Sequence, residues 1–376
     1  MAAGWTIRIA DPDAREIAFA LNAAFGAARV GGADVVSVAT APAPGLDGLA
    51  LIHAVALHPS RDGADRIVKI AYAGPLFPDR SSVAVNTLDA DKVELTADSF
   101  WFPFDASFGA RLTADIQIRV AGDWQPVAAG RIDRTPVGYR LRQDRPALDI
   151  AVSLLSSSVR YPAQDWTIFD ARREPGTKIP ELKAALNGCA AYLNALAGPA
   201  GPLPPASIIV TGRAEASYAR GTLISLSDIE NEGEEALRQF ICHELAHYWS
   251  RAHIGGPDNW INEGVADHLA NMAVREALGE AVYAARLVRY RDWLNGYDLP
   301  PVWTAGATVR PPHLVLYRKA PLLLAELENR VGRKAFAAFM QALMANPPVT
   351  TRDFLNELER VAGTPTKHWF EAKLAE

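Results

Sequence analysis

The sequence predicts an α+β protein of two domains, in which an antiparallel β-rich domain (residues 1–160) precedes a mostly helical domain (residues 161–376). Two observations carry this prediction. Short apolar runs separated by Gly, Pro and Asp dominate the first part, whereas apolar residues at helical spacing dominate the second. The chain has 376 residues, which is enough mass for two hydrophobic cores.

Strand-like runs follow one another through the first domain, and their intervals indicate an antiparallel sandwich or a saddle-shaped sheet. We expect one short helix at Arg15–Phe25, and we expect the aromatic segment Phe100–Phe104 to lie in a core or at a domain contact. The predicted strands are Trp5–Ala10, Asp34–Thr40, Leu51–Leu57, Ile67–Tyr72, Val83–Asn86, Lys92–Thr96, Ala114–Val120, Trp124–Ala129 and Val137–Arg142.

The second domain is predicted to begin near Tyr161 with few strands and many helices. A helix over residues 178–197 ends at a Gly/Pro-rich stretch, and two apolar strands follow at Ser207–Thr211 and Gly221–Ser227. Three short helices are predicted near the end of the chain, at Lys334–Ala345, Arg352–Gly363 and Thr366–Leu374.

One helix between these segments bears residues with metal-binding chemistry. Asn231 and the glutamates after it fit a helix N-terminus, and the apolar residues recur at helical spacing. His243 and His247 are one turn apart on this helix, so both imidazoles can reach a zinc ion at about 2.0–2.1 Å. Glu244 has the position of the general base in an HExxH hydrolase.

A catalytic zinc site needs a third protein ligand. Glu263 is our first candidate, because residues 255–257 break the first helix and a second, antiparallel helix would return this carboxylate to the histidines. Asp267 lies one turn beyond Glu263 and is expected to accept the second ring N–H of a ligand histidine.

The rival third ligand is His253, which has the spacing of the metzincin signature after His247. That signature has a glycine where this chain has Ser250, and the turn there favours φ > 0. A methionine turn should also follow, but Met272 falls in a predicted helix. These departures favour Glu263 over His253.

Composition excludes some classes of function. The formal net charge is −5, with 38 basic and 43 acidic residues, which gives no reason to expect binding to nucleic acid or to an anionic membrane. No apolar run approaches the length of a transmembrane helix.

Only two cysteines are present, so we expect no disulfide framework and interpret Cys242 as a small buried residue rather than a ligand. The first residues lack a secretory signal, so we expect a cytoplasmic protein, or a periplasmic or secreted one if a leader was removed.

Two segments of the helical domain carry a specific resemblance. His243–Trp249 and Trp260–Ala266 are similar to the HELAHxW and WLNEGFA patterns of gluzincin aminopeptidases of the aminopeptidase N type. The resemblance implies a thermolysin-like catalytic domain with one zinc ion held by His243, His247 and Glu263. The family usually has eighteen residues between the second histidine and the glutamate, whereas residues 248–262 make a shorter connection here.

Other parts of the family pattern add expectations for substrate binding. The stretch around Tyr317 resembles the family's YxKGA segment, which implies that Tyr317 donates a hydrogen bond to the tetrahedral oxyanion. By analogy with thermolysin-like domains, residues 219–226 border the cleft as a substrate-binding edge, with Gly221, Thr222 and Leu223 along it.

Two family features have no match. The GxMEN segment, whose glutamate holds the free α-amine of the substrate, corresponds to residues 212–220, which differ from it; Glu215 is a possible substitute from another register. The large helical C-terminal domain of the family has no counterpart after residues 333–376, so we expect an open cleft that accepts longer peptides.

Together, these residues predict a zinc-dependent metallopeptidase in which Glu244 activates a zinc-bound water, and which is not a strict aminopeptidase. Two alternatives stay open. One is a zinc-bearing scaffold that binds peptides or a partner without cutting them, and the other is a zinc hydrolase of a non-peptide substrate such as an epoxide or an ester.

Overall fold

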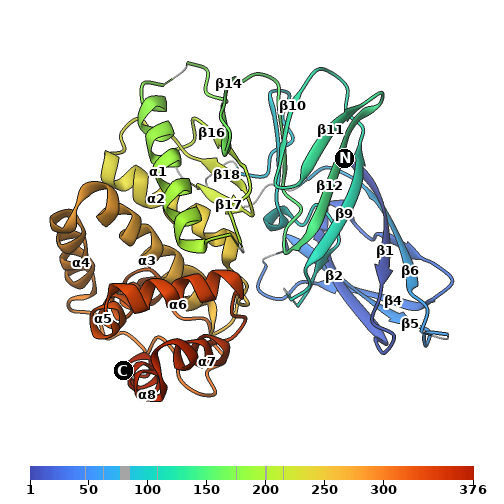
Figure 1. Ribbon diagram of the computed structural model, residues 1–376. Helices are drawn as coiled ribbons and strands as arrows, with labels where there is room; N and C mark the ends of the chain where they lie inside the picture. Colours follow the sequence, from blue (N-terminus) through green and yellow to red (C-terminus); the bar gives the residue numbers. More distant parts are fainter. Residues whose placement is uncertain are drawn as a thin grey trace. The chain divides into compact units, whose positions relative to one another are not determined.

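Figure 1 shows the computed structural model of the chain, which describes residues 1–46, 48–61, 63–76, 85–107, 109–174, 176–199, 201–214 and 216–376. The chain divides into two compact units. Unit 1 consists of Met1–Ser158 with Arg213–Ala216, and unit 2 consists of Val159–Gly212 with Ser217–Glu376. Unit 1 is built of antiparallel sheets and unit 2 is mostly helical, which confirms the predicted α+β fold class.

Among its described residues, unit 1 contains four small antiparallel sheets, with strand orders β4-β5-β2-β8, β1-β6-β3, β10-β13-β7 and β11-β12-β9. Alternation in the sequence determines which side chains are buried: in β6, Val68, Ile70 and Tyr72 enter a core, while Lys69 points to solvent. The strands are β1 (Ala2–Ile9), β2 (Glu16–Asn22), β3 (Arg29–Gly31), β4 (Val35–Pro42), β5 (Ala50–Leu57), β6 (Arg66–Ala73), β7 (Lys92–Leu95), β8 (Phe104–Asp105), β9 (Leu112–Ile118), β10 (Gln125–Ala128), β11 (Arg131–Thr135), β12 (Gly138–Ala147) and β13 (Val152–Leu155).

The predicted helix at Arg15–Phe25 is wrong. This segment forms β2 and a 3-10 turn, η1 (Ala23–Phe25). Strand β2 pairs with β5 on one side and β8 on the other, and its second half is buried, so tertiary pairing overrides the local helix propensity. The aromatic segment Phe100–Phe104 lies in the core of unit 1, as expected. The first half of the predicted strand Val83–Asn86 falls outside the described residues.

Unit 2 has one five-stranded sheet, ordered β14-β15-β16-β18-β17, in which β15, β16 and β18 are parallel and both outer strands are antiparallel. One hydrophobic core connects this sheet to most of the helices. The elements are β14 (Val159–Pro162), β15 (Trp166–Asp170), β16 (Ala206–Val210), β17 (Tyr218–Arg220), β18 (Leu223–Leu226), α1 (Ile179–Ala197), α2 (Glu234–Ala246), α3 (Asn259–Leu278), α4 (Glu280–Leu294), α5 (Ala320–Val331), α6 (Arg333–Ala345), α7 (Thr351–Ala362) and α8 (Thr364–Leu374), with two short helical turns, η3 (His247–Trp249) and η4 (Val315–Lys319).

The π-helical turn η4 leads directly into α5 and carries Tyr317. Pro321 lies in the first turn of α5 and has no amide hydrogen to donate to the carbonyl of Tyr317, four residues earlier. That carbonyl accepts a hydrogen bond of 2.6 Å from the guanidinium of Arg318. The proline therefore accompanies a local widening of the helix, a feature that is frequent at functional sites.

A disulfide joins Cys189 of α1 to Cys242 of α2, with their Cα atoms 5.2 Å apart. No disulfide framework was expected from the sequence, and this single bridge was not foreseen, whereas Cys242 is fully buried as expected. The two cysteines are 53 residues apart in sequence, and only the packing of α1 against α2 brings them within bonding distance.

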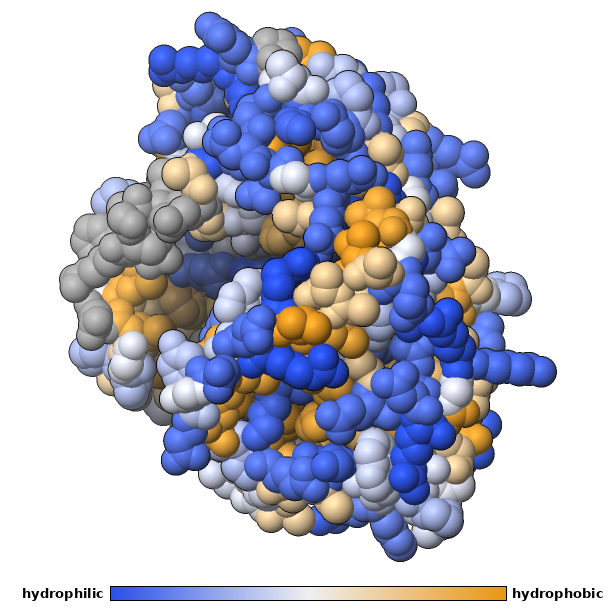
Figure 2. Space-filling model, turned by 90° about the vertical axis from the view of Figure 1, so that its left-hand side faces the viewer, coloured by the Kyte–Doolittle hydropathy of each residue, from blue (hydrophilic) through white to orange (hydrophobic). Residues whose placement is uncertain are grey.

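Hydrophilic residues cover most of the face shown in Figure 2, and the hydrophobic residues on it lie in separate patches. Scattered exposed apolar side chains are normal on a water-facing protein surface. Within the described part of the chain, we find no helix with the length and apolar character needed to cross a membrane.

Candidate metal centre

Helix α2 places both histidines of the motif. It begins at Glu234, after Gly233 in extended conformation, so the predicted N-terminus at Asn231 is a few residues early. Glu234 and Glu235 lie in the first turn, where their negative charges interact favourably with the positive end of the helix dipole. The buried side chains Leu237, Ile241 and Leu245 hold the helix against the core of unit 2.

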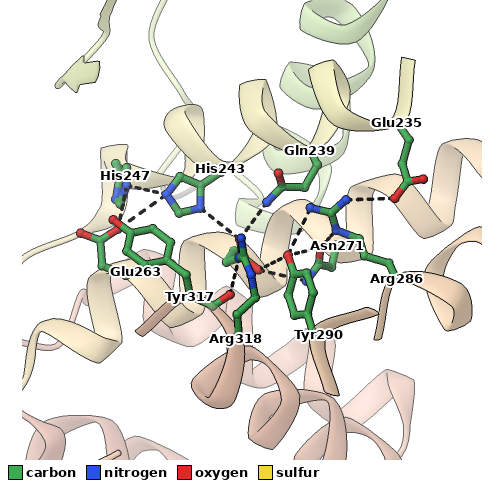
Figure 3. Close-up of polar contacts among 11 residues, drawn as sticks. Glu235, Gln239, His243, His247, Glu263, Asn271, Arg286, Tyr290, Tyr317 and Arg318 are labelled. Carbon is green, nitrogen blue, oxygen red and sulfur yellow. Dashed lines mark hydrogen bonds and ion pairs between the residues drawn. The ribbon is translucent and has the colours of Figure 1, made fainter. Parts of the chain in front are cut away.

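Three potential ligand atoms converge between α2, η3 and α3 (Figure 3). The Nε2 atoms of His243 and His247 are 3.0 Å apart, and Oε2 of Glu263 lies 3.6 Å and 3.4 Å from them. Tetrahedral zinc with bonds of about 2.0–2.1 Å separates its ligand atoms by about 3.3 Å. Oε2 of Glu263 is also buried without a hydrogen bond in the described structure. Two imidazoles and a carboxylate at these distances fit a zinc ion.

The electrostatics of these three side chains suit a cation. Burial favours the neutral form of Glu263, but the charge of His247 and the interaction with His243 outweigh it and lower the pKa of Glu263 to about 2. Burial lowers the pKa of the His247 imidazole, which favours the neutral, metal-binding form. For His243, burial is opposed by the interaction with Glu263 and by nearby carboxylates, so its pKa is raised.

The rival ligand His253 is exposed and lies outside the His243–His247–Glu263 cluster. Ser250, at the position of the metzincin glycine, has an extended backbone with φ −71°. Its hydroxyl lies 3.2 Å from Nδ1 of His247, within hydrogen-bond distance. This contact was not expected from the sequence, although a side-chain oxygen three residues after a ligand histidine could have indicated it.

Asp267 lies behind His243, but it makes no hydrogen bond to it in this structure, because its Oδ1 is 3.7 Å from Nδ1 of the imidazole. The carboxylate is held by Gln239, whose amide donates to Oδ1 at 2.8 Å, and by Tyr290 and Asn271, which donate to Oδ2 at 2.7 Å and 3.2 Å. None of these three donors was expected from the sequence. Gln239 alone had a local signal, since it precedes His243 by one helical turn.

Glu244 and Tyr317 also lie at this site. Glu244 is only 8% exposed, and its charge contributes to the raised pKa values of His243 and Tyr317. The ring of Tyr317 stacks on that of His243, with centroids 5.6 Å apart. Burial is the largest cause of the raised pKa of Tyr317, followed by the charge of Glu263 and a hydrogen bond with it. Tyr317 is therefore a protonated hydroxyl donor.

Only part of the expected edge, residues 219–226, lies at the edge of the sheet. The outer strand of the sheet is β17, Tyr218–Arg220, whereas Gly221 and Thr222 form the turn after it. Leu223 begins β18, which is fully buried between β16 and β17, so it is not at the edge. Strands β17 and β18 form a short hairpin, and the spacing of apolar residues alone does not show which of the two strands is the outer one. Glu215, the possible amine anchor, lies outside the described residues.

Neither a protein-family model nor a curated protein matches the sequence. Solved structures do match the fold along the whole chain. The M1 zinc metallopeptidase of Deinococcus radiodurans superimposes with a TM-score of 0.74 at 15% identity, covering 100% of this chain and 89% of that one. A substituted form of it, bound to the peptide Tyr-Ser-Ala, gives 0.72 at 15% identity, with the same coverage.

Leukotriene A4 hydrolase of Saccharomyces cerevisiae gives a TM-score of 0.68 at 15% identity, covering 98% of this chain and 63% of its own length. The chain therefore has an M1-like zinc metallopeptidase fold. At 15% identity, the similarity to these structures is evidence for the fold alone.

Proposed function

We propose that this chain is a zinc-dependent metallopeptidase that hydrolyses peptide bonds. The convergence of His243, His247 and Glu263 beside Glu244 and Tyr317 supports the proposal most directly. A structural metal site would be closed by four protein ligands, whereas three ligands next to a carboxylate and a phenol are typical of a hydrolytic centre. We propose zinc as the metal because its usual ligands are present at the right separations.

A zinc ion at this site would polarise the scissile carbonyl and acidify water. Glu244 takes the proton of the attacking water and returns it to the leaving amine. Tyr317 donates its hydroxyl hydrogen to the carbonyl oxygen as negative charge develops there, a contribution of about 10²–10³ in rate. The raised pKa of Tyr317 keeps this hydrogen in place at neutral pH.

We propose that the peptide backbone adds to the outer edge of β17 as a further strand. The charge of Arg220, at the end of β17, contributes to the lowered pKa of His247, after the larger effects of burial and of the neighbouring charges. Strand β17 also contacts α2, the helix that carries His243, and this contact supports a substrate-binding edge beside the metal ligands. The absence of a GxMEN match in residues 212–220 argues against strict aminopeptidase activity.

The experiment that tests the function is mass spectrometry of a peptide library incubated with the zinc-loaded wild type and with Glu244→Gln. The library contains the same peptides with free and with blocked N-termini. Cleavage by the wild type alone supports a peptidase. Internal cuts in blocked peptides indicate an endopeptidase, whereas stepwise loss of residues from free N-termini indicates an aminopeptidase.

Failure of zinc-loaded wild type to cut any peptide would contradict the proposal. Retention of a peptide without cleavage would then favour the binding scaffold. Hydrolysis of an ester or epoxide panel, abolished by Glu244→Gln, would favour a non-peptide hydrolase.

A further inference from the structure

Tyr290 of α4 lies behind the candidate metal centre, fully buried and far in sequence from the ligand histidines. Its hydroxyl is 2.7 Å from Oδ2 of Asp267. No motif indicates a role for this residue, because the sequence near it predicts only an amphipathic helix. The structure gives it a specific partner beside the zinc ligands.

The surroundings of Tyr290 determine the direction of its hydrogen bond. Nη2 of Arg286 lies 3.2 Å from the same hydroxyl, and a guanidinium can only donate. The phenol oxygen therefore accepts from Arg286, and its single hydrogen has two acceptors in reach, Oδ2 of Asp267 at 2.7 Å and Oδ1 of Asn271 at 3.4 Å. The shorter distance favours the carboxylate of Asp267. Arg286 is itself fixed by Asn271, at 2.6 Å, and by Glu235, at 2.9 Å.

These contacts fix the orientation of the Asp267 carboxylate. Tyr290 and Asn271 hold Oδ2, while Oδ1 accepts from Gln239 and faces Nδ1 of His243 at 3.7 Å. A histidine that binds a metal through Nε2 almost always donates its other ring N–H to such a partner, and that partner sets the tautomer and the ring orientation. An oxygen with two lone pairs can accept from both Gln239 and His243.

We propose that Tyr290 is a positioning residue of the metal centre: by locking Oδ2 of Asp267 it aims Oδ1 at Nδ1 of His243 and so raises the affinity for zinc. The proposal rests on the metal centre of the proposed function, but not on the reaction or the substrate. In this proposal α4, which contributes no metal ligand, holds the Asp267 carboxylate that orients His243.

The substitution Tyr290→Phe removes the hydrogen bond to Asp267 together with the one from Arg286. The guanidinium of Arg318 lies over the rings of Tyr290 and Trp293, at 4.6 Å from each centroid. Phenylalanine keeps the ring and its packing against Arg318, and it removes only the hydroxyl. Tyr283→Phe is the matched control: Tyr283 is also buried on α4, two turns earlier, where its ring lies under Arg275.

The test is zinc affinity, measured by competition with a chelator of known affinity, together with thermal unfolding of the zinc-free proteins. We expect Tyr290→Phe to weaken zinc binding by about 10- to 100-fold and Tyr283→Phe to leave it within about twofold of the wild type. In an Asp267→Asn background, Tyr290→Phe should weaken binding no further, because the hydroxyl acts through Asp267.

Unchanged zinc affinity in Tyr290→Phe would overturn the proposal, and so would equal losses in Tyr290→Phe and Tyr283→Phe. If Tyr290→Phe does not fold, Gln239→Met removes the other anchor of Asp267 from a less buried position, and unchanged zinc affinity in that variant would also overturn the proposal. A wild type that binds zinc tightly but cuts no peptide would refute the proposed function and leave this inference standing. A wild type that binds no zinc would refute both.

Discussion

The ring of Tyr317 lies against the ring of His243, with centroids 5.6 Å apart and an angle of 28° between their planes. Tyr317 also stacks on His313, with centroids 4.4 Å apart and an angle of 22°. The phenol ring therefore packs against both a proposed metal ligand and an exposed histidine one turn earlier in the chain. These contacts restrict the orientation of the ring and so the position of its hydroxyl oxygen.

From this stack we predict that His313→Ala lowers kcat by about 3- to 10-fold, because an aromatic pair contributes about 0.5–1.5 kcal/mol. Zinc content should not change, since His313 is not a ligand. His313→Phe retains a stacking ring and should keep most of the activity. Steady-state kinetics of both variants with bound zinc quantified would check this. If Tyr317→Phe and His313→Ala lower kcat independently, with effects that multiply in the double variant, the stacking argument fails.

A second prediction concerns the general base. Glu244→Gln keeps the shape of the side chain but cannot accept the proton of water, so kcat should fall by about 10²–10⁴-fold. The ligand atoms are unaffected, and zinc content measured by atomic absorption should equal that of the wild type. Loss of zinc from Glu244→Gln would show instead that Glu244 belongs to the ligand set.

A third prediction separates the two ligand schemes. Glu263→Ala removes the carboxylate that lies 3.4–3.6 Å from both Nε2 atoms, so zinc should be lost on dialysis against a mild chelator. His253→Ala is the control, because this side chain is exposed and lies outside the cluster. Zinc retained in the first variant and lost in the second would reverse the assignment in favour of His253.

The parts of this site that the sequence predicted are those set by local geometry. His243 and His247 share a face of α2 because one helical turn separates them, and Glu263 follows in the next helix. The contacts that were missed join residues far apart in sequence: Gln239 with Asp267, Asp267 with Tyr290, and Arg286 with Glu235. Nothing within α2, α3 or α4 specifies how these helices pack on one another.

The errors in the fold prediction have the same origin. Glu16–Asn22 has a composition that suits a helix, and it becomes a strand because β5 and β8 flank it. The edge of the second sheet was placed at residues 219–226 by analogy with thermolysin-like domains, yet the apolar run that begins at Leu223 is typical of a buried inner strand. Spacing also gave no sign that Cys189 and Cys242 face each other across two helices.

A fourth prediction follows from the disulfide. Cross-linking residues 53 positions apart restricts the unfolded chain, which corresponds to about 4 kcal/mol in the chain-entropy description. Reduction should lower the free energy of unfolding of the wild type by about this amount, measured with denaturant in the presence and absence of reductant. The double variant Cys189→Ala, Cys242→Ala should be less stable and insensitive to reductant. Two free thiols per chain in protein purified without reductant would contradict the pairing.

The last prediction concerns acid stability and His268, whose ring is fully buried on α3 and lies against Phe336. Burial, with a smaller contribution from Arg275, lowers the pKa of His268 to about 4, while Glu328 and the carbonyl of Pro321 oppose the shift. An unfolded histidine has a pKa of about 6.5. Since the folded pKa is the lower one, the unfolded chain binds more protons below pH 6.5, and the folded state loses stability as the pH falls towards 4.

The difference between the folded pKa of about 4 and the unfolded pKa of about 6.5 corresponds to about 3 kcal/mol in the free energy of unfolding. This contribution is fully present above pH 6.5 and is lost as the pH falls to 4. His268→Leu has no proton to bind, so its free energy of unfolding should fall less steeply than that of the wild type over this range. Denaturant unfolding of zinc-free protein at several pH values measures both slopes. His368→Leu, at an exposed histidine of the same unit, is the control and should keep the wild-type slope. Equal slopes in His268→Leu and the wild type would show that His268 is protonated in the folded protein, or that the unfolded state shares its environment.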